Sequence, residues 1–373
     1  MKNNKRFITA CLCLAAAIAI CCVTGANFLK ARELPMPVEG PGVTEVKMLS
    51  DWFEGLKGTH ADTPVYVLQG SEPGGKMLIL GGTHGNEPSG YMSAFTFIEN
   101  AKVDKGTVFV IPYTNRSGMT HNDPGEGNMQ YFTLQTQSGP RTFRFGSRAT
   151  NPIDQWPDPD IYTHRSSGQT LSGSETRNLN RCYPGVENGT LSERVAYAVT
   201  NMINTEGIDM EIDLHESSPE YAVNNATVAH ERAMTIASEG VLDLQLEGIS
   251  MSLEPSPVTL HGLTHRELGD FTNTYALLME TGNPSQGRLR GRTDEALAQT
   301  GIDPCYVINY DLGLLYVDYS SGSFPMELRV GRHLAGIQAY INAFNNNSEK
   351  QIVVEGIPTY DEMLTNKVGY YLK

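Results

Sequence analysis

The stretch MLILGGTHGNEPSG, residues 77–90, contains an apolar run, a glycine-rich turn and two polar side chains that the turn does not need. The run Met77–Leu80 is typical of a buried strand, and the glycines after it are typical of a tight turn. Nothing in such a turn requires His84 or Glu87, which lie three residues apart. Either the two are incidental residues of a strand-to-helix turn, or they form part of a functional site.

Apolar runs and helical spacings alternate along most of the chain. Short apolar runs predict strands at 65–68, 76–80, 107–111, 210–214, 226–229 and 276–279, and helical spacing predicts helices at 88–100, 191–204, 327–345 and from about 231. This alternation predicts an α/β fold, with a mixed, largely parallel sheet flanked by helices. Residues 112–177 lack such periodicity and are rich in Gly, Pro, Asn and Ser, so we expect a long irregular insert there.

The overall composition is that of an ordinary globular protein with an acidic surface. The 373 residues are 40% hydrophobic and 19% charged, and the formal net charge is −14. A chain with this charge repels phosphate backbones, which argues against nucleic acid as a partner.

The first 26 residues have the pattern of an export signal. Lys2, Lys5 and Arg6 precede an uncharged stretch at 7–26, and Thr24-Gly25-Ala26 offers small residues for cleavage. The stretch is also long enough to span a bilayer if it is not cleaved. The sequence therefore predicts an exported protein of the periplasm or cell envelope, with residues 1–26 as a signal peptide or a membrane anchor, and membrane attachment through 7–26 in the second case.

Polar side chains follow three of the predicted strands. His84 and Glu87 follow the first. In the stretch MEIDLHESS a predicted strand ends at His215, and in YALLMETGN another ends at Glu280. Sites in open α/β sheets form outside the carboxyl ends of the strands, so we expect these four side chains to converge.

Two imidazoles and one carboxylate make a suitable ligand set for a catalytic zinc ion, because they leave a fourth position for water. The sequence thus predicts one Zn²⁺ per chain, held by His84, Glu87 and His215. The metal lowers the pKa of its water toward ~7. Glu280 is suited to accept the proton from that water and to deliver it to the leaving amine.

The run ETRNLNRCYPG, residues 175–185, supplies groups that bind a carboxylate. Arg177 and Arg181 offer the planar fork that pairs with carboxylates, and Asn180 adds a donor. Each of these residues alone has a common structural role, such as a surface ion pair. Their order along the chain, together with the strand-end residues, favours a site for an anionic substrate.

The motifs GGTHGNE, NLNRCYPG, DLHES and METGN together resemble the succinylglutamate desuccinylase/aspartoacylase family, a branch of the zinc carboxypeptidase-like hydrolases. The similarity covers residues from about 64 to 290. It implies a zinc carboxypeptidase-like fold with His84, Glu87 and His215 as zinc ligands and Glu280 as the catalytic carboxylate. It also implies that Asn180 and Arg181 hold the substrate carboxylate, and that Arg181 helps to polarise the scissile carbonyl.

The chain departs from the family pattern at two points. Asn178 stands where the family usually has an Asp, which in the wider fold supports a zinc-bound His. Family members also carry another arginine upstream of the Asn-Arg pair, for which Arg148, Arg165 and Arg177 are the candidates. We include Arg177 with Asn180 and Arg181 in the predicted substrate-binding set.

These observations predict an exported zinc-dependent hydrolase that cleaves an amide bond next to a carboxylate. The first interpretation is a deacylase of small anionic N-acyl amino acids. The alternatives are a carboxypeptidase-like metallopeptidase of the cell envelope, acting on a peptide, and a non-catalytic binding protein of the same fold.

The sequence also suggests how the chain is divided. After the first 26 residues, we expect a segment leading into the domain at 27–63, a catalytic domain at 64–346, and a C-terminal tail at 347–373 that packs on it. The sequence leaves open whether Cys182 and Cys305 pair, and what the oligomeric state is.

Overall fold

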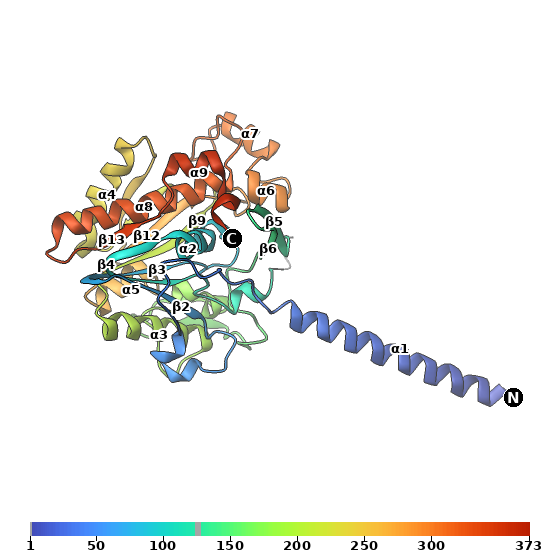
Figure 1. Ribbon diagram of the computed structural model, residues 1–373. Coiled ribbons are helices and arrows are strands. Elements are labelled where there is room, and N and C mark those ends of the chain that lie inside the picture. The colour runs from blue at the N-terminus through green and yellow to red at the C-terminus, as the bar shows by residue number, and fades with distance from the viewer. Residues whose placement is uncertain (1, 124–127) are drawn as a thin grey trace. The chain divides into compact units, whose positions relative to one another are not determined.

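The computed structural model describes residues 2–123 and 128–373 and divides into two compact units, Met1–Pro35 and Met36–Lys373 (Figure 1). The first unit is mostly one long helix, α1 (Lys2–Lys30). The second unit contains the central sheet, the helices that cover it and all the predicted site residues.

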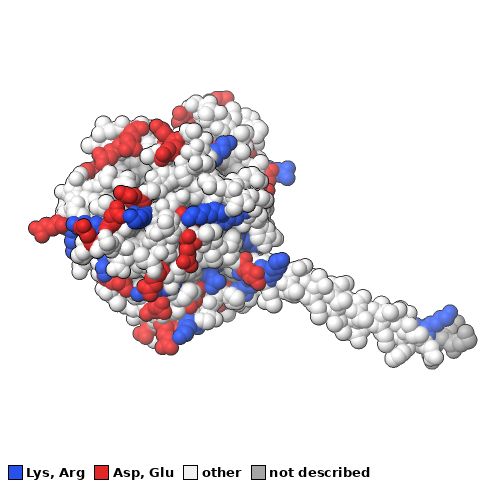
Figure 2. Space-filling model, viewed as in Figure 1, with Lys and Arg blue, Asp and Glu red and all other residues white. Residues whose placement is uncertain are grey.

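Helix α1 is apolar enough and long enough to cross a membrane. A window of 18 residues within Asn4–Lys30 has a mean hydropathy of 2.5. Figure 2 shows its surface as almost free of charge beyond the basic residues near its start. A signal sequence and a membrane anchor share these properties, so the cleavage of this segment stays a prediction.

Nine described strands of the second unit form one mixed sheet. Its order is β1-β2-β4-β3-β9-β12-β10-β11, with β13 paired to β4. The central strands β4, β3, β9 and β12 run parallel, while antiparallel pairs join β1, β2 and β13 on one side and β10 on the other. The strands are β1 (Glu45–Met48), β2 (Pro64–Gln69), β3 (Glu72–Leu80), β4 (Lys102–Ile111), β9 (Met210–Ser217), β10 (Ala226–Ala229), β11 (Ser252–Pro255), β12 (Tyr275–Gly282) and β13 (Val353–Glu355).

Helices cover both faces of this sheet, which confirms the predicted fold class (Figure 1). Leu78 and Leu80 of β3 point into one core with the apolar side of α3, while α2, α4 and α8 lie on the opposite face. The helices are α2 (Pro88–Asn100), α3 (Leu191–Glu206), α4 (Met234–Leu246), α5 (Thr264–Phe271), α6 (Glu295–Thr300), α7 (Pro304–Asp311), α8 (Met326–Asn347) and α9 (Tyr360–Asn366).

The predicted strands and helices all fall on observed ones, but the insert at 112–177 is less irregular than expected. It contains two hairpins, one formed by β5 (Tyr131–Thr136) with β6 (Gly139–Arg144) and one formed by β7 (Ile161–Thr163) with β8 (Thr170–Ser172). Neither hairpin was predicted, because β5 and β6 are largely polar without an apolar run, and β7 and β8 have only three residues each. Cys182 and Cys305 are both free cysteines in this structure.

Candidate metal centre

The candidate centre lies where the parallel strands β3, β9 and β12 end. His84 follows β3, His215 lies near the end of β9, and Glu280 lies near the end of β12. His215 and Glu280 are register partners on neighbouring strands, so their backbones are one strand spacing apart, about 4.8 Å. The sheet therefore brings together residues that are almost 200 positions apart in the sequence.

The turn after β3 places Glu87 beside β9. Gly82 adopts a positive φ of 62°, which a side chain would strain, and α2 then begins with Pro88 directly after Glu87. Helix α2 lies very close to β9, since a methyl group at Gly90 would come within 2.3 Å of the Leu214 carbonyl oxygen. This close approach brings the Glu87 carboxylate between the two histidines.

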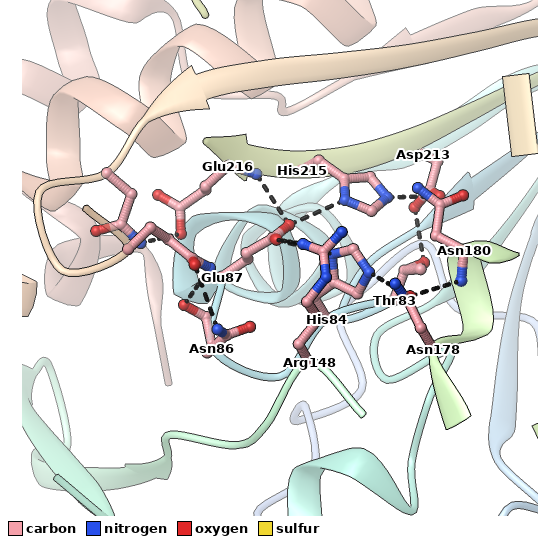
Figure 3. Close-up of polar contacts among 12 residues, drawn as sticks. Thr83, His84, Asn86, Glu87, Arg148, Asn178, Asn180, Asp213, His215 and Glu216 are labelled. Carbon is pink, nitrogen blue, oxygen red and sulfur yellow. Dashed lines mark hydrogen bonds and ion pairs between the residues drawn. The ribbon is translucent and has the colours of Figure 1, made fainter. Parts of the chain in front are cut away.

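The three predicted metal ligands form one buried cluster (Figure 3). Glu87 Oε1 lies 2.7 Å from His84 Nδ1, and Glu87 Oε2 lies 2.9 Å from His215 Nδ1. One ligand atom from each residue lies within 4.8 Å of the others, and all three side chains are nearly fully buried. These distances are short enough for the three residues to bind a single ion.

The outer hydrogen bonds set the direction of both imidazoles. His84 Nε2 donates to Asn178 Oδ1 at 2.9 Å, and His215 Nε2 faces the Asp213 carboxylate at 2.7 Å. The Asn178 amide is itself fixed, because its oxygen accepts from the Asn180 N–H and its nitrogen donates to Glu175. With its proton on Nε2, each neutral ring directs the lone pair of Nδ1 toward Glu87.

This arrangement is suited to a cation. With both rings neutral, the two Nδ1 atoms and the Glu87 carboxylate would all offer lone pairs to one ion placed among them. Burial, followed by the nearby charge of Arg148, lowers the pKa of His84 to about 4, which favours the neutral form that binds metals. Burial also acts to lower the pKa of His215, but Asp213 and Glu87 outweigh it and raise that pKa, so a metal ion must displace a proton there.

Glu280 differs from the other acidic groups of the centre because it lacks a hydrogen-bond partner on one oxygen. Its Oε2 is buried and unpartnered among the described residues, and burial is the main reason that its pKa rises to about 8. A carboxyl group with a pKa near neutrality can both take up and release a proton during a reaction.

A pocket of about 460 Å³ opens onto the cluster. Its polar part includes the cluster, Glu280, Asn180, Arg181 and Arg148. Its remaining lining comes from Glu216, Ser217, Ser218, Tyr221, Val223, Val228, Glu254, Pro255, Pro257, Leu260, Leu263, His265, Leu278 and Gln286. The structure therefore places the predicted metal ligands, Glu280, Asn180 and Arg181 around one cavity.

Asn180 and Arg181 belong to a short 3₁₀ turn, Leu179–Arg181, that is tied to the start of α5. Asn180 Oδ1 accepts from the Thr264 N–H at 3.0 Å, and Arg181 donates to the Asn180 carbonyl oxygen at 2.6 Å. The nearest carboxylate to Arg181 is Glu175, at 3.8 Å, so a substrate carboxylate would have little competition for this guanidinium.

The structure does not bring Arg177 to the pocket, in contrast to its predicted role in substrate binding. Its guanidinium forms two hydrogen bonds with Asp158, at 2.7 and 2.9 Å, and a third with the Thr150 carbonyl oxygen. Arg177 ends one 3₁₀ turn and Arg181 ends the next, with the extended residue Asn178 between the two turns, so nearness in sequence does not give the two side chains the same direction. Arg165 is also outside the pocket lining and lies 3.6 Å from Glu193.

Arg148 is the upstream arginine that reaches the site. Its Nη1 lies 3.5 Å from His84 Nδ1 and 3.6 Å from Glu87 Oε1 (Figure 3). Two backbone hydrogen bonds bring it there, from Gly85 N to Ser147 O and from Gly146 N to Gly85 O. The sequence offered Arg148 only as one of three candidates, because such pairing between distant segments leaves no local signal.

Comparison with known proteins gives matches among solved structures only. No protein-family model and no curated protein matches the chain. A succinylglutamate desuccinylase from Silicibacter sp. TM1040 aligns at 17% identity over 61% of this chain and 55% of that chain, with a TM-score of 0.38. The cell shape determinant protein Csd4 from Helicobacter pylori aligns at 13% identity over 81% and 59%, with a TM-score of 0.47.

A metallo-carboxypeptidase from Burkholderia cenocepacia aligns at 12% identity over 87% of this chain and 69% of that chain, with a TM-score of 0.46. The chain thus spans little more than half the length of the first two proteins.

Proposed function

We propose that the chain is a zinc-dependent hydrolase that cleaves an amide bond next to a carboxylate. The observation that carries this proposal is the shared pocket, in which two imidazoles and Glu87 converge opposite the unpartnered carboxyl group of Glu280. His84, Glu87 and His215 would hold the zinc ion. When bound, such an ion supplies a Lewis acid and lowers the pKa of water toward ~7.

The protein groups around the cluster divide the remaining tasks. Arg181 and Asn180 bind the carboxylate of the substrate and so place the amide bond beside the cluster. Arg148 provides a positive charge where negative charge develops on the carbonyl oxygen. Glu280 accepts a proton from the attacking water and then donates it to the nitrogen of the leaving amine.

Our first candidate for the reaction is the deacylation of an N-acyl amino acid, and the second is the release of the last residue of a peptide. Both reactions release an amino acid with a free carboxylate, and both therefore use Arg181 in the same way. Glu280 argues against a third role, as a non-catalytic binding protein. A buried carboxyl oxygen without a partner, such as Glu280 Oε2, lowers stability, and binding alone gives no reason to retain it.

A panel of N-acyl amino acids and short peptides, assayed with and without a chelator, tests the proposal. We expect hydrolysis that stops on chelation and returns with added zinc. The relative rates on acyl amino acids and on peptides separate the first two candidates. Zinc bound at one ion per chain without turnover of any compound in the panel would contradict the hydrolase and favour the binding protein.

We also propose that the protein is exported to the periplasm or cell envelope, with α1 as its signal or anchor. The charge-free length of α1 after a basic start supports this location. Cell fractionation is the test. Recovery of the whole pool from the cytosol, with residues 1–26 still attached, would contradict it.

A further inference from the structure

Part of the pocket lies along one face of the sheet. Leu278 of β12, Val228 of β10 and Glu254 of β11 are successive register partners, and all three line the pocket. Register partners on neighbouring strands point to the same face of a sheet. Because strands lie about 4.8 Å apart, this row extends about 10 Å from Leu278 to Glu254. We call this part of the pocket the side chamber.

The wall of the side chamber is fastened to the residues that bind the carboxylate. Leu260 and Leu263 line it from the loop that precedes α5. A methyl group at Gly262, in the same loop, would lie 2.2 Å from the Arg181 carbonyl oxygen, so the loop lies directly against that residue. The side chamber therefore adjoins Asn180 and Arg181, where it would receive the side chain of the amino acid whose carboxylate they bind.

Glu254 is the acidic residue at the far end of this apolar row. Its side chain is partly buried, and no hydrogen bond or ion pair to it is found in the described part of the chain. Glu216, by contrast, also lines the pocket but pairs with Arg329 at 2.6 Å. Glu254 is therefore available to pair with a cation that enters the chamber.

His265, which also lines the pocket, does not neutralise Glu254. His265 Nδ1 lies 2.8 Å from Ser256 Oγ, and burial lowers the pKa of His265 to about 3, so that its ring carries no charge near neutral pH. The surroundings of Glu254 thus combine apolar walls with an uncompensated negative charge.

We propose that Glu254 selects substrates whose released amino acid has a long aliphatic side chain with a positively charged end, such as lysine or ornithine. This inference rests on the proposed hydrolysis and specifies its substrate. The aliphatic stem would lie over Leu278 and Val228, and the cationic end would pair with Glu254. The carboxylate of the same residue would still bind Arg181, so that each end of the amino acid meets an opposite charge.

Matched substrates test the inference. Nα-acetyl-lysine and Nα-acetyl-norleucine have the same α-carboxylate and acyl group and differ only at the end of the side chain. The ratio of their kcat/KM values therefore measures the preference for the positively charged end. We expect a ratio of at least about 10 for the wild type, since a charge-assisted hydrogen bond contributes roughly that factor or more. The ratio should fall toward one in Glu254→Gln and should stay unchanged in Glu247→Gln, which removes an exposed acid outside the pocket.

A charge reversal gives a second test that does not depend on the loss of a preference. Glu254→Arg should prefer N-acetyl-glutamate to N-acetyl-lysine. Equal use of lysine and norleucine substrates by the wild type, or a preference that survives Glu254→Gln, would overturn the inference while leaving the hydrolase intact.

Binding of free amino acids keeps the inference testable if no substrate is turned over. Calorimetry should show tighter binding of lysine than of norleucine to the zinc-loaded protein, and no such difference in Glu254→Gln. If this difference appears without turnover, the proposed hydrolysis fails and the role of Glu254 in recognition stands. If lysine and norleucine bind with the same affinity, the proposal that Glu254 recognises the cationic end is wrong.

Discussion

Two clusters in the described part of the chain combine two histidines with one glutamate, and they differ in how the rings are held. In both clusters one ligand atom from each residue lies within 4.8 Å of the others. In the first, His84, Glu87 and His215, each ring gives Nε2 to an outer acceptor and directs Nδ1 inward. The second consists of His164, His261 and Glu267.

In the second cluster, His164 uses both of its nitrogens within the protein. Its Nε2 lies 2.6 Å from the Tyr183 carbonyl oxygen, which only accepts, so this nitrogen carries the proton. Its Nδ1 then accepts from Ser167 Oγ at 2.8 Å and has no lone pair left for a metal. Residue composition alone therefore does not identify a metal site, because the outer hydrogen bonds determine which nitrogens are available.

The largest effect is expected from His215→Ala, which removes one inward nitrogen of the first cluster. The zinc content should fall from one ion per chain to near zero, and hydrolysis should be lost with it. Elemental analysis of the purified variant, beside the wild type, is the measurement. Full zinc occupancy in His215→Ala would remove His215 from the ligand set and would end the distinction between the two clusters.

Glu280→Gln should separate the chemistry from the metal. Glu280 is not a proposed ligand, so the variant should keep its zinc while kcat falls by ~10²–10⁴-fold, the usual contribution of general acid–base catalysis. Paired measurements of metal content and kcat on one substrate test this. A kcat near that of the wild type would show that the proposed proton transfer is wrong, whatever the metal content.

Asn178→Ala tests whether an outer hydrogen bond makes the first cluster a metal site. The variant leaves His84 in place but removes the oxygen that fixes its ring. Loss of such an outer partner typically lowers metal affinity ~10–100-fold. Competition with a chelator of known affinity measures the change. An affinity equal to that of the wild type would mean that the turn around Gly82 holds the ring without Asn178.

A pH series compares one acidic group at each site, Glu267 of the second cluster and Glu280, which lies in the pocket beside the first cluster. Glu267 accepts from the Gly262 N–H at 3.0 Å and contacts His261 at 2.8 Å, whereas Glu280 Oε2 has no partner. Burial raises the pKa of Glu280 from 4.5 to about 8, so the folded state holds its proton where the unfolded state has lost it. Metal-free wild type should therefore lose stability relative to Glu280→Gln as pH rises from 4.5 to 8.

Thermal unfolding of the two metal-free proteins at pH 4.5 and pH 8 measures this difference. The Tm of Glu280→Gln should exceed that of the wild type by a small amount at pH 4.5 and by a larger amount at pH 8. An equal advantage at both values would mean that folding does not raise the pKa of Glu280.

The smallest effect is expected from His261→Ala in the second cluster. The variant should keep one zinc ion per chain and its hydrolytic activity, and it should lose about 1 kcal/mol of stability through its hydrogen bond to Glu267. A fall in zinc content to the level of His215→Ala would show that the second cluster also binds metal.

The sequence was most informative where the signal is local. The strand that ends at Leu80 and the one that contains His215 were predictable because buried strands are short apolar runs and because sites follow their carboxyl ends. The four motifs then supplied the proposed roles. The sequence also showed that Asn178 replaces the usual Asp of the family. It did not show that Glu175 fixes the Asn178 amide.

Other parts of the site depend on contacts between distant segments. Arg148 reaches the cluster only because residues 146 and 147 pair with Gly85. Glu254 lies in the pocket because two strand pairings place it beside Val228, in one row with Leu278. The register of such pairings depends on the whole sheet, so the short stretches around Arg148 and Glu254 gave no reason to single them out.

The register between β9 and β12 has a consequence for how this protein could diversify. The spacing of His215 and Glu280 is set by backbone hydrogen bonds of adjacent strands, whereas much of the side chamber comes from the loop that contains Leu260. Substitutions and insertions in such a loop leave the ladder between the strands unchanged. Related chains could therefore exchange one released amino acid for another while they inherit the same distance between ligand and base.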